Sequence, residues 1–404
     1  GMDIFVKFVS QKVGKVRWQP SSYKGIQFSD TFVTGSWDDE ENKISLWKVP
    51  EVQSKAGAAG SWQQDYPQQK TPATLDGQAG EGEQEPALLC QLKHGGDVTD
   101  IRFVNQEVFL ASSSSGSVQA FRCNKAKQDF VPSQKWDSIH HHTADSCACT
   151  CVAVNGTDIS TCGEDGRINV LRLEHRQPIR TIDEADSCSI NALTHLKQHE
   201  VITVNSAGQL KIWDLRQPGS QPTRFFIVSG EKVPLHCVDR HPTQPHLVAT
   251  GGQNGILNIW DMRKEQLPVT LFDVHQSHVW EVKFHPTSPN NLFTCSDDGT
   301  VLHWDATKGQ SSTGSAFRNM NTPTGPNPSS NLLLRGSTRT APSVDSETSS
   351  PWLSSETTSN QLEINHVLPG NCNPVNSLDV EGPQLICGTD GEALYYIPNM
   401  NIYL

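Results

Sequence analysis

The feature that most constrains this chain is a spacing that recurs along it: an aromatic residue or leucine follows a turn residue by five positions. The pairs are Asn42/Trp47, Gly116/Phe121, Gly166/Leu171, Gly208/Trp213, Gly255/Trp260, Gly299/Trp304 and Gly391/Tyr396. Most intervals between them are about 42–50 residues, the length of a four-stranded propeller blade. Two longer intervals indicate insertions. The chain is therefore expected to present surfaces, and any catalytic site has to be shown separately.

One copy of the repeat, residues 278–304, illustrates which residues form the strands and turns of a blade. Residues 278–284 alternate apolar and polar side chains, which is typical of a half-buried strand, and Pro286 ends it because proline cannot donate to a ladder. Residues 291–296 form the next expected strand. Gly299 then supplies the hairpin turn, and residues 300–304 form the third strand.

Three copies end their third strand in a Trp-Asp dipeptide, at Trp213-Asp214, Trp260-Asp261 and Trp304-Asp305. Recurrence of this dipeptide after a Gly-containing turn resembles the WD-repeat family. The other four copies keep the spacing with different residues. The sequence therefore predicts an all-β, seven-bladed WD-repeat propeller.

The two ends of the repeat array predict how the ring closes. The last copy, residues 374–397, supplies three strands, whereas residues 4–9 read as a strand with no blade of their own. We expect the N-terminal strand to complete the last blade, because this removes two open edges. Residues 2–404 then form one propeller.

Two segments interrupt the repeats. Residues 51–85 are rich in Gly, Ala, Gln and Glu, and residues 310–360 are rich in Ser, Thr, Asn and Pro. Such compositions cannot bury enough apolar surface to become ordered, so we expect disordered insertions in the first and sixth blades. They are either tolerated loops or regulated docking segments. Thr322 and Ser350, each followed by proline, are candidate phosphorylation sites.

Composition narrows the class of partner. The formal net charge is −12 and no run of basic residues occurs, which argues against direct nucleic-acid binding. No apolar stretch reaches the ~20 residues of a membrane span, and the first residues lack a signal-peptide profile. Eleven scattered cysteines suit a reducing compartment.

A histidine run, residues 140–142, precedes Cys147, Cys149 and Cys151, and these side chains could in principle bind zinc or copper. The spacing is not that of a structural zinc site, and Cys149 and Cys151 fall at the start of an expected strand. We therefore expect an exposed connector, and no metal or cofactor. The carboxylate clusters at 38–41 and 297–298 lie in turns, which explains them without catalysis.

Two further sets of residues are typical of WD repeats. His275, Thr294, Asp298 and Trp304 resemble a buried hydrogen-bonded network that stiffens a blade. Arg216 and Arg263 complete Trp-Asp-x-Arg motifs in adjacent blades, and paired motifs of this kind resemble those of substrate receptors for cullin-type ubiquitin ligases. Arginine after Trp-Asp is also common in any WD repeat, so both interpretations stay open.

Particular stretches resemble the family of the 43-kDa nucleoporin, the small WD-repeat member of the Y-shaped outer-ring complex of the nuclear pore. They are residues 7–12, 34–38, 163–169, 204–214, 233–242 and 292–296. The resemblance covers nearly the whole chain, but not the two insertions or the Cys/His stretch.

The resemblance implies a non-enzymatic scaffold that contacts outer-ring nucleoporins, including a helical-solenoid subunit. It also implies roles in pore assembly, in nucleocytoplasmic transport and, together with kinetochore proteins, at the kinetochore in mitosis. We also expect the chain to be monomeric in isolation.

Overall fold

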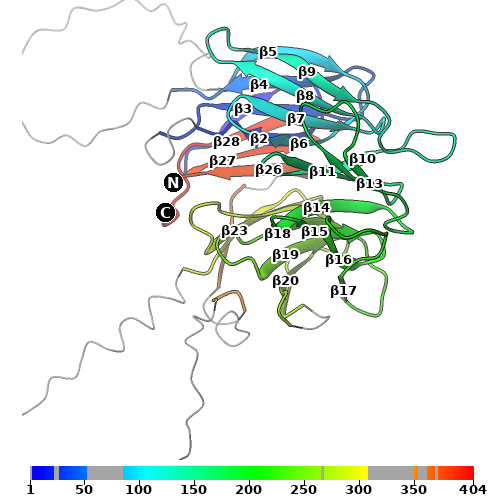
Figure 1. Cartoon of the computed structure of the whole chain (residues 1–404). Coiled ribbons are helices and arrows are strands. Elements are labelled where there is room, and N and C mark those ends of the chain that lie inside the picture. The colour runs from blue at the N-terminus through cyan, green and yellow to red at the C-terminus, as the bar shows by residue number, and fades with distance from the viewer. Residues whose placement is uncertain are drawn as a thin grey trace, which may run out of the picture.

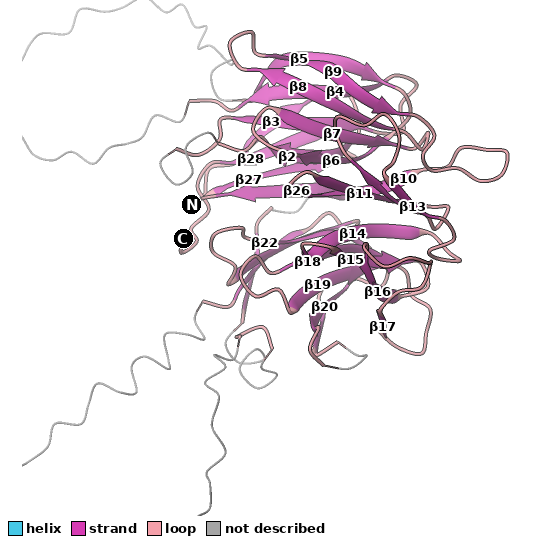
Figure 2. Ribbon diagram, viewed as in Figure 1, coloured by secondary structure: helices cyan, strands magenta, loops and turns pink. Residues whose placement is uncertain are grey.

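A computed structural model describes residues 2–21, 27–51, 85–264, 268–307, 350–353, 362–368 and 372–404. Within these ranges the chain forms 28 strands arranged as seven four-stranded antiparallel sheets, and Figure 2 shows strands and loops only. The predicted all-β, seven-bladed propeller is confirmed. No helix able to cross a membrane occurs in the ranges just given.

Blades one to six follow one another along the chain, and the first strand of each contacts the first strand of the next, so these strands surround the central axis. Blade one contains β2 (Val13–Trp18), β3 (Thr31–Ser36), β4 (Asn42–Lys48) and β5 (Ala87–His94); blade two contains β6 (Val98–Phe103), β7 (Val108–Ser113), β8 (Val118–Asn124) and β9 (Asp129–Trp136); blade three contains β10 (Cys149–Asn155), β11 (Asp158–Gly163), β12 (Ile168–Leu171) and β13 (Arg180–Ile182).

The next three blades repeat this order. Blade four contains β14 (Ile190–Lys197), β15 (Glu200–Asn205), β16 (Gln209–Asp214) and β17 (Arg224–Ile227); blade five contains β18 (Leu235–Arg240), β19 (Leu247–Gly252), β20 (Ile256–Asp261) and β21 (Thr270–Asp273); blade six contains β22 (Val279–Phe284), β23 (Asn291–Ser296), β24 (Val301–Asp305) and β25 (Glu363–His366).

Blade seven joins the two ends of the chain. It consists of β26 (Val375–Glu381), β27 (Gln384–Thr389), β28 (Ala393–Ile397) and, as its outermost strand, β1 (Phe5–Phe8). β1 runs antiparallel to β28, with Phe5 opposite Tyr396 and Phe8 opposite Ala393. The predicted closure is therefore confirmed, and the N- and C-termini lie close together in Figure 1.

The hairpin turns have the chemistry that the repeat spacing predicts. Gly255 and Gly299 adopt positive φ angles of 81° and 86°, a conformation that side chains disfavour. A Cβ atom on Gly255 would lie 2.3 Å from the carbonyl oxygen of His275. The glycine is therefore required both by the turn and by the close approach of the connector before blade six.

Neighbouring blades are joined near the axis by aspartates of the innermost strands. Asp100 accepts a hydrogen bond from the backbone N–H of Val152 in the next blade (2.9 Å), and Asp379 accepts one from Trp18 (2.8 Å). These bonds satisfy backbone N–H groups of the innermost strands that point toward the adjacent blade. The link from Asp379 to Trp18 also joins blade seven to blade one.

The expected insertions, 51–85 and 310–360, lie largely outside the described residues. Residues 350–353 are described, and they pack on blade six rather than standing apart from it. Trp352 is fully buried, contacts Phe284 edge-on and donates its indole N–H to the carbonyl oxygen of Pro289 (3.1 Å). The range 310–360 is therefore too wide as a disordered segment, because an apolar anchor lies within it.

Candidate functional site

The blade topology divides the loops between two faces of the disc. One face, here called the connector face, carries the turns between second and third strands and the connectors that lead from each blade to the next. The Lys12 ammonium in one connector lies 2.7 Å from Asp38 in the neighbouring turn, and the Asp38 N–H donates to Asp97 in another connector (2.8 Å). The opposite face, called the hairpin face, carries the remaining turns.

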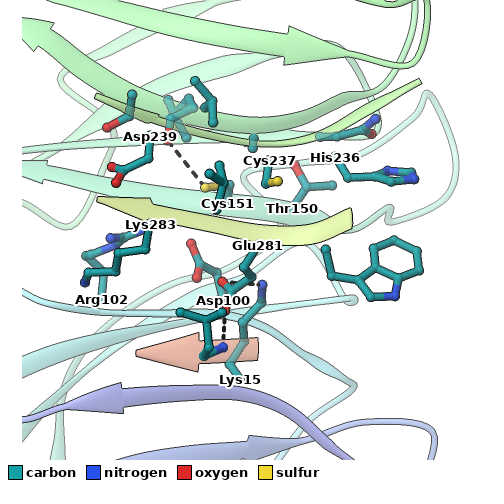
Figure 3. A pocket seen from close by; sticks show the side chains of 18 of the residues that line it. Lys15, Asp100, Arg102, Thr150, Cys151, His236, Cys237, Asp239, Glu281 and Lys283 are labelled. Carbon is teal, nitrogen blue, oxygen red and sulfur yellow. Dashed lines mark hydrogen bonds and ion pairs between the residues drawn. The ribbon is translucent and has the colours of Figure 1, made fainter. Parts of the chain in front are cut away.

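The central channel is lined by the first strands of all seven blades and encloses a cavity of about 90 Å³. Figure 3 shows that its charged side chains, from several different blades, converge on one space. The positive side chains include Lys15, Arg102 and Lys283, and the negative ones include Asp239 and Glu281. With opposite charges so close together, the channel holds an internal ion-pair network more readily than a charged ligand.

The strongest part of this network spans three blades. The Arg17 guanidinium of blade one lies 2.6 Å from Glu281 of blade six and 3.2 Å from Asp100 of blade two. Burial raises the pKa of Glu281, but the Arg17 and Lys15 charges outweigh it and hold that pKa well below its usual range. Glu281 also accepts the backbone N–H of Leu378 in blade seven (2.9 Å), so one carboxylate ties the closing blade to its neighbours.

Above the network, the channel opens on the connector face into a cavity of about 340 Å³. Trp37 and Trp280 line this mouth together with Asp97, Glu164 and His236. The His236 ring lies 4.6 Å from the Trp280 ring, centroid to centroid. Burial, with a contribution from His278, lowers the pKa of His236 to about 4, so this imidazole is neutral at physiological pH. The mouth therefore combines aromatic surfaces with carboxylates.

The structure brings together the four residues of the expected network in blade six. The Trp304 indole donates to the Thr294 hydroxyl (2.9 Å), and Thr294 is bonded to Nε2 of His275 (2.7 Å). Nδ1 of His275 faces Asp298 (3.3 Å) and Thr300 (2.9 Å). Since Thr300 donates its own proton to Asp298, Nδ1 carries the ring proton and Nε2 accepts. Thr300 is the member that the sequence pattern missed.

The histidine run considered for metal binding holds a second network of the same kind. Nδ1 of His140 is bonded to Asp165 (2.9 Å) and Nε2 to the Thr161 hydroxyl (2.8 Å), so neither nitrogen presents a free lone pair to a metal. Burial raises the pKa of Cys149 well above its usual value, whereas a metal ligand has to be a thiolate. No group of three metal-binding side chains occurs in the portion of the chain described.

The role of His140 carried a sequence signal. Thr161 precedes Asp165 by the interval that separates Thr294 from Asp298 in blade six. Leu171 occupies the position of the blade-six tryptophan, and this substitution hid the resemblance.

Comparisons with known proteins agree with the propeller and extend it. Human nucleoporin Nup43 is 43% identical over 400 residues, covering 97% of this chain and 98% of the human protein, and mouse Nup43 matches to the same extent. The chain belongs to the nucleoporin Nup43 family. A Dictyostelium discoideum nuclear pore complex protein nup43 is 30% identical over 139 residues, 32% of this chain and 33% of that protein. A profile of the Nucleolar protein 10-like N-terminal propeller domain matches residues 138–334.

Membership in the Nup43 family makes the chain a structural WD-repeat protein and not an enzyme. The side-chain contacts inside the propeller also stabilise the structure. In the described residues, the charged groups of the channel are ion-paired, and the histidines of blades three and six are hydrogen-bonded inside their blades. We therefore seek the function of this Nup43-family chain in its surfaces.

The two Trp-Asp-x-Arg arginines of this Nup43-family propeller fold back on their own motifs. The Arg216 guanidinium makes two hydrogen bonds to Asp214, and Arg263 makes two to Asp261. The hydrogen bonds from Arg216 lower the pKa of Asp214 to about 2. The side chains keep exposed fractions of 65% and 45%. Each arginine therefore supports its own turn and also remains accessible from outside.

The candidate phosphorylation sites have different environments. Thr322 lies outside the described residues. Ser350 is buried, with an exposed fraction of 4%, and its hydroxyl accepts the backbone N–H of Trp352 (3.4 Å). A kinase could reach Ser350 only after the Trp352 anchor had left blade six.

Proposed function

We propose that this protein is a non-enzymatic scaffold subunit of the nuclear pore, within the Y-shaped outer-ring complex, where it binds nucleoporin partners that include a helical-solenoid subunit. The observation that carries this proposal is the match to Nup43 along almost the whole of both chains. The 43% identity runs over 97% of this chain and 98% of the human protein, so the likeness covers the whole of both proteins and not one shared segment. Roles in pore assembly, transport and mitotic kinetochores belong to the same proposal.

The fold supports a scaffold role in physical terms. The channel network and the links between blades fix the ring, so partners meet a preformed surface and little ordering entropy is lost on docking. The large apolar side chains that remain exposed lie mainly on outermost strands. They include Phe8 (73%), Val131 (54%), Phe225 (53%) and Leu271 (52%). Such residues on the rim suit contact with other proteins.

Affinity purification of the tagged full chain from interphase cells tests the proposal, with co-purifying proteins quantified by mass spectrometry. We expect outer-ring nucleoporins in near-equal amounts. Recovery of a cullin adaptor without nucleoporins would contradict the scaffold proposal and favour the ubiquitin-ligase alternative.

A pair of variants separates the two functions directly. Arg216→Ala with Arg263→Ala should abolish adaptor recovery if the chain is a ligase receptor, and should leave nucleoporin recovery unchanged if it is a scaffold. Arg172→Ala with Arg176→Ala is the matched control, since it removes the same charge from the same face in blade three.

A further inference from the structure

We infer that the mouth of the channel on the connector face binds an extended, lysine- or arginine-rich peptide segment of a partner protein, with one cationic side chain entering the mouth cavity. This inference rests on the proposed function to the extent that a scaffold subunit holds protein partners. It goes further by naming one face and the chemistry of what that face recognises.

The mouth has the size and lining for a side chain rather than for a folded element. Its volume of about 340 Å³ lies at the lower end of ligand-binding cavities. Trp37 of blade one and Trp280 of blade six supply aromatic walls, while Asp97 and Glu164 supply carboxylates. Lys15 also lines the mouth, but its ammonium is paired with Glu281 of the channel network (3.2 Å). Below them the Arg17–Glu281 network occupies the channel, so a ligand enters only from the connector face.

The charge of the connector face selects a cation. Its turns carry carboxylates at 38–41, 164–165, 297–298 and 390–392, whereas the lysines and arginines among its described turn and connector residues are Lys12, Arg167 and Lys232. Arg167 is already paired with Asp165 (2.6 Å) and Asp183 (2.7 Å), and Lys12 with Asp38. The face therefore presents a negative field, which attracts a basic segment and repels nucleic acids and anionic lipids.

The protein already makes the contact that we propose. The Lys12 ammonium lies 5.1 Å from the centroid of the Trp37 ring and 2.7 Å from the Asp38 carboxylate. This arrangement, a cation over an indole with a carboxylate beside it, is the geometry that binds lysine or arginine from outside. Trp37 is also a wall of the mouth, and Lys12 covers one face of its ring. The mouth therefore offers an incoming cation the rest of that indole and Trp280, with Glu164 as the carboxylate.

Glu164 is the residue on which the test depends. Its side chain is exposed and lines the mouth. Glu174 is also exposed and lies in the same blade, but on the hairpin face between β12 and β13. Reversing either charge changes the net charge equally, so a difference between the two variants reports position and not overall electrostatics.

The experiment titrates the purified full chain with a short peptide of alternating lysine and glycine, followed by tryptophan fluorescence and by calorimetry. We expect saturable binding that weakens with added salt, an about tenfold weaker affinity for Glu164→Lys, and at most an about twofold change for Glu174→Lys. The corresponding glutamate–glycine peptide should not bind.

Absence of saturable binding at low salt would overturn the inference, as would equal losses in the two variants or preferential binding of a single-stranded oligonucleotide. Because both glutamates are exposed, thermal unfolding of the variants should match wild type, and this checks that folding is intact. Nucleoporin recovery is scored in a separate purification, so failure of peptide binding is distinguishable from failure of the scaffold proposal.

Discussion

Blades three and six contain the same histidine, threonine and aspartate network, but only blade six extends it to a tryptophan. Trp304 donates to Thr294 in blade six, whereas Leu171 fills that position in blade three and makes no such bond. Blades one, four and five show the converse, a tryptophan bonded to a threonine without the histidine; the pairs are Trp47 with Thr34, Trp213 with Thr203 and Trp260 with Thr250. The tryptophan and the histidine therefore bond the threonine independently of each other, and blade six has both bonds.

The largest expected effect comes from removing either histidine. His140→Ala and His275→Ala each leave a buried threonine and a carboxylate without their partner and open a cavity, which should cost about 3 kcal/mol. Urea unfolding of both variants measures this free energy. The exposed His142→Ala is the control and should be neutral. A cost below about 0.5 kcal/mol for His140→Ala would mean that the network stabilises a blade only when tryptophan completes it.

A smaller effect is expected from the tryptophan bonds. Both tryptophan-to-phenylalanine substitutions remove the same buried volume and leave a cavity, so the comparison concerns the hydrogen-bond part of the loss. Trp304→Phe removes one hydrogen bond, but Thr294 keeps His275, so this part should be about 1 kcal/mol. Trp213→Phe leaves Thr203 without its indole partner in a blade that has no such histidine, and this part should be about 2 kcal/mol. The same urea experiment compares the two variants. Equal losses would show that the histidine does not support the threonine.

The smallest effect is a pH dependence in blade six. Burial holds the pKa of His275 below its usual 6.5, although Asp298 opposes the shift. The unfolded chain therefore binds a proton more readily, so this contribution is complete above pH 6.5 and is lost as the pH falls below it. The difference in unfolding free energy between wild type and His275→Gln should shrink from pH 7.5 to pH 5.5. Other buried histidines cancel in this difference, and a constant difference would contradict the assignment.

The blades could be predicted from local sequence because the strands of each blade are near neighbours in the chain and pair as a meander. The turn glycines and the alternating strands around Gly299 predicted the fold and its closure. The blade-six network was also visible, since Trp304 marks it. The structural role of His140 was missed because Leu171 stands where the other network has its tryptophan. The adjacent histidines instead suggested metal binding.

Contacts that form only when the ring closes could not be predicted from local sequence. Arg17 and Glu281 meet only because blades one and six face the same axis, and neither residue differs in type or spacing from an ordinary surface charge. Trp352 is similar, because one anchor in a polar stretch has no periodicity that could reveal it. Burial by distant parts of the chain, and not propensity, decides the roles of these residues.

The pairing of β1 with β28 has a consequence for the order of events during biosynthesis. β1 cannot find its partner until β28 has been made, so blade seven is completed after the other six have had time to form. Contacts at such sequence separation are slow to form, and until β28 is made Phe5 of the waiting strand lacks the Tyr396 ring on which it stacks in the closed blade. The nascent chain thus passes through an incomplete propeller in which β1 is unpaired. Ring closure is therefore the folding step at which chaperones would bind the largest exposed strand edge.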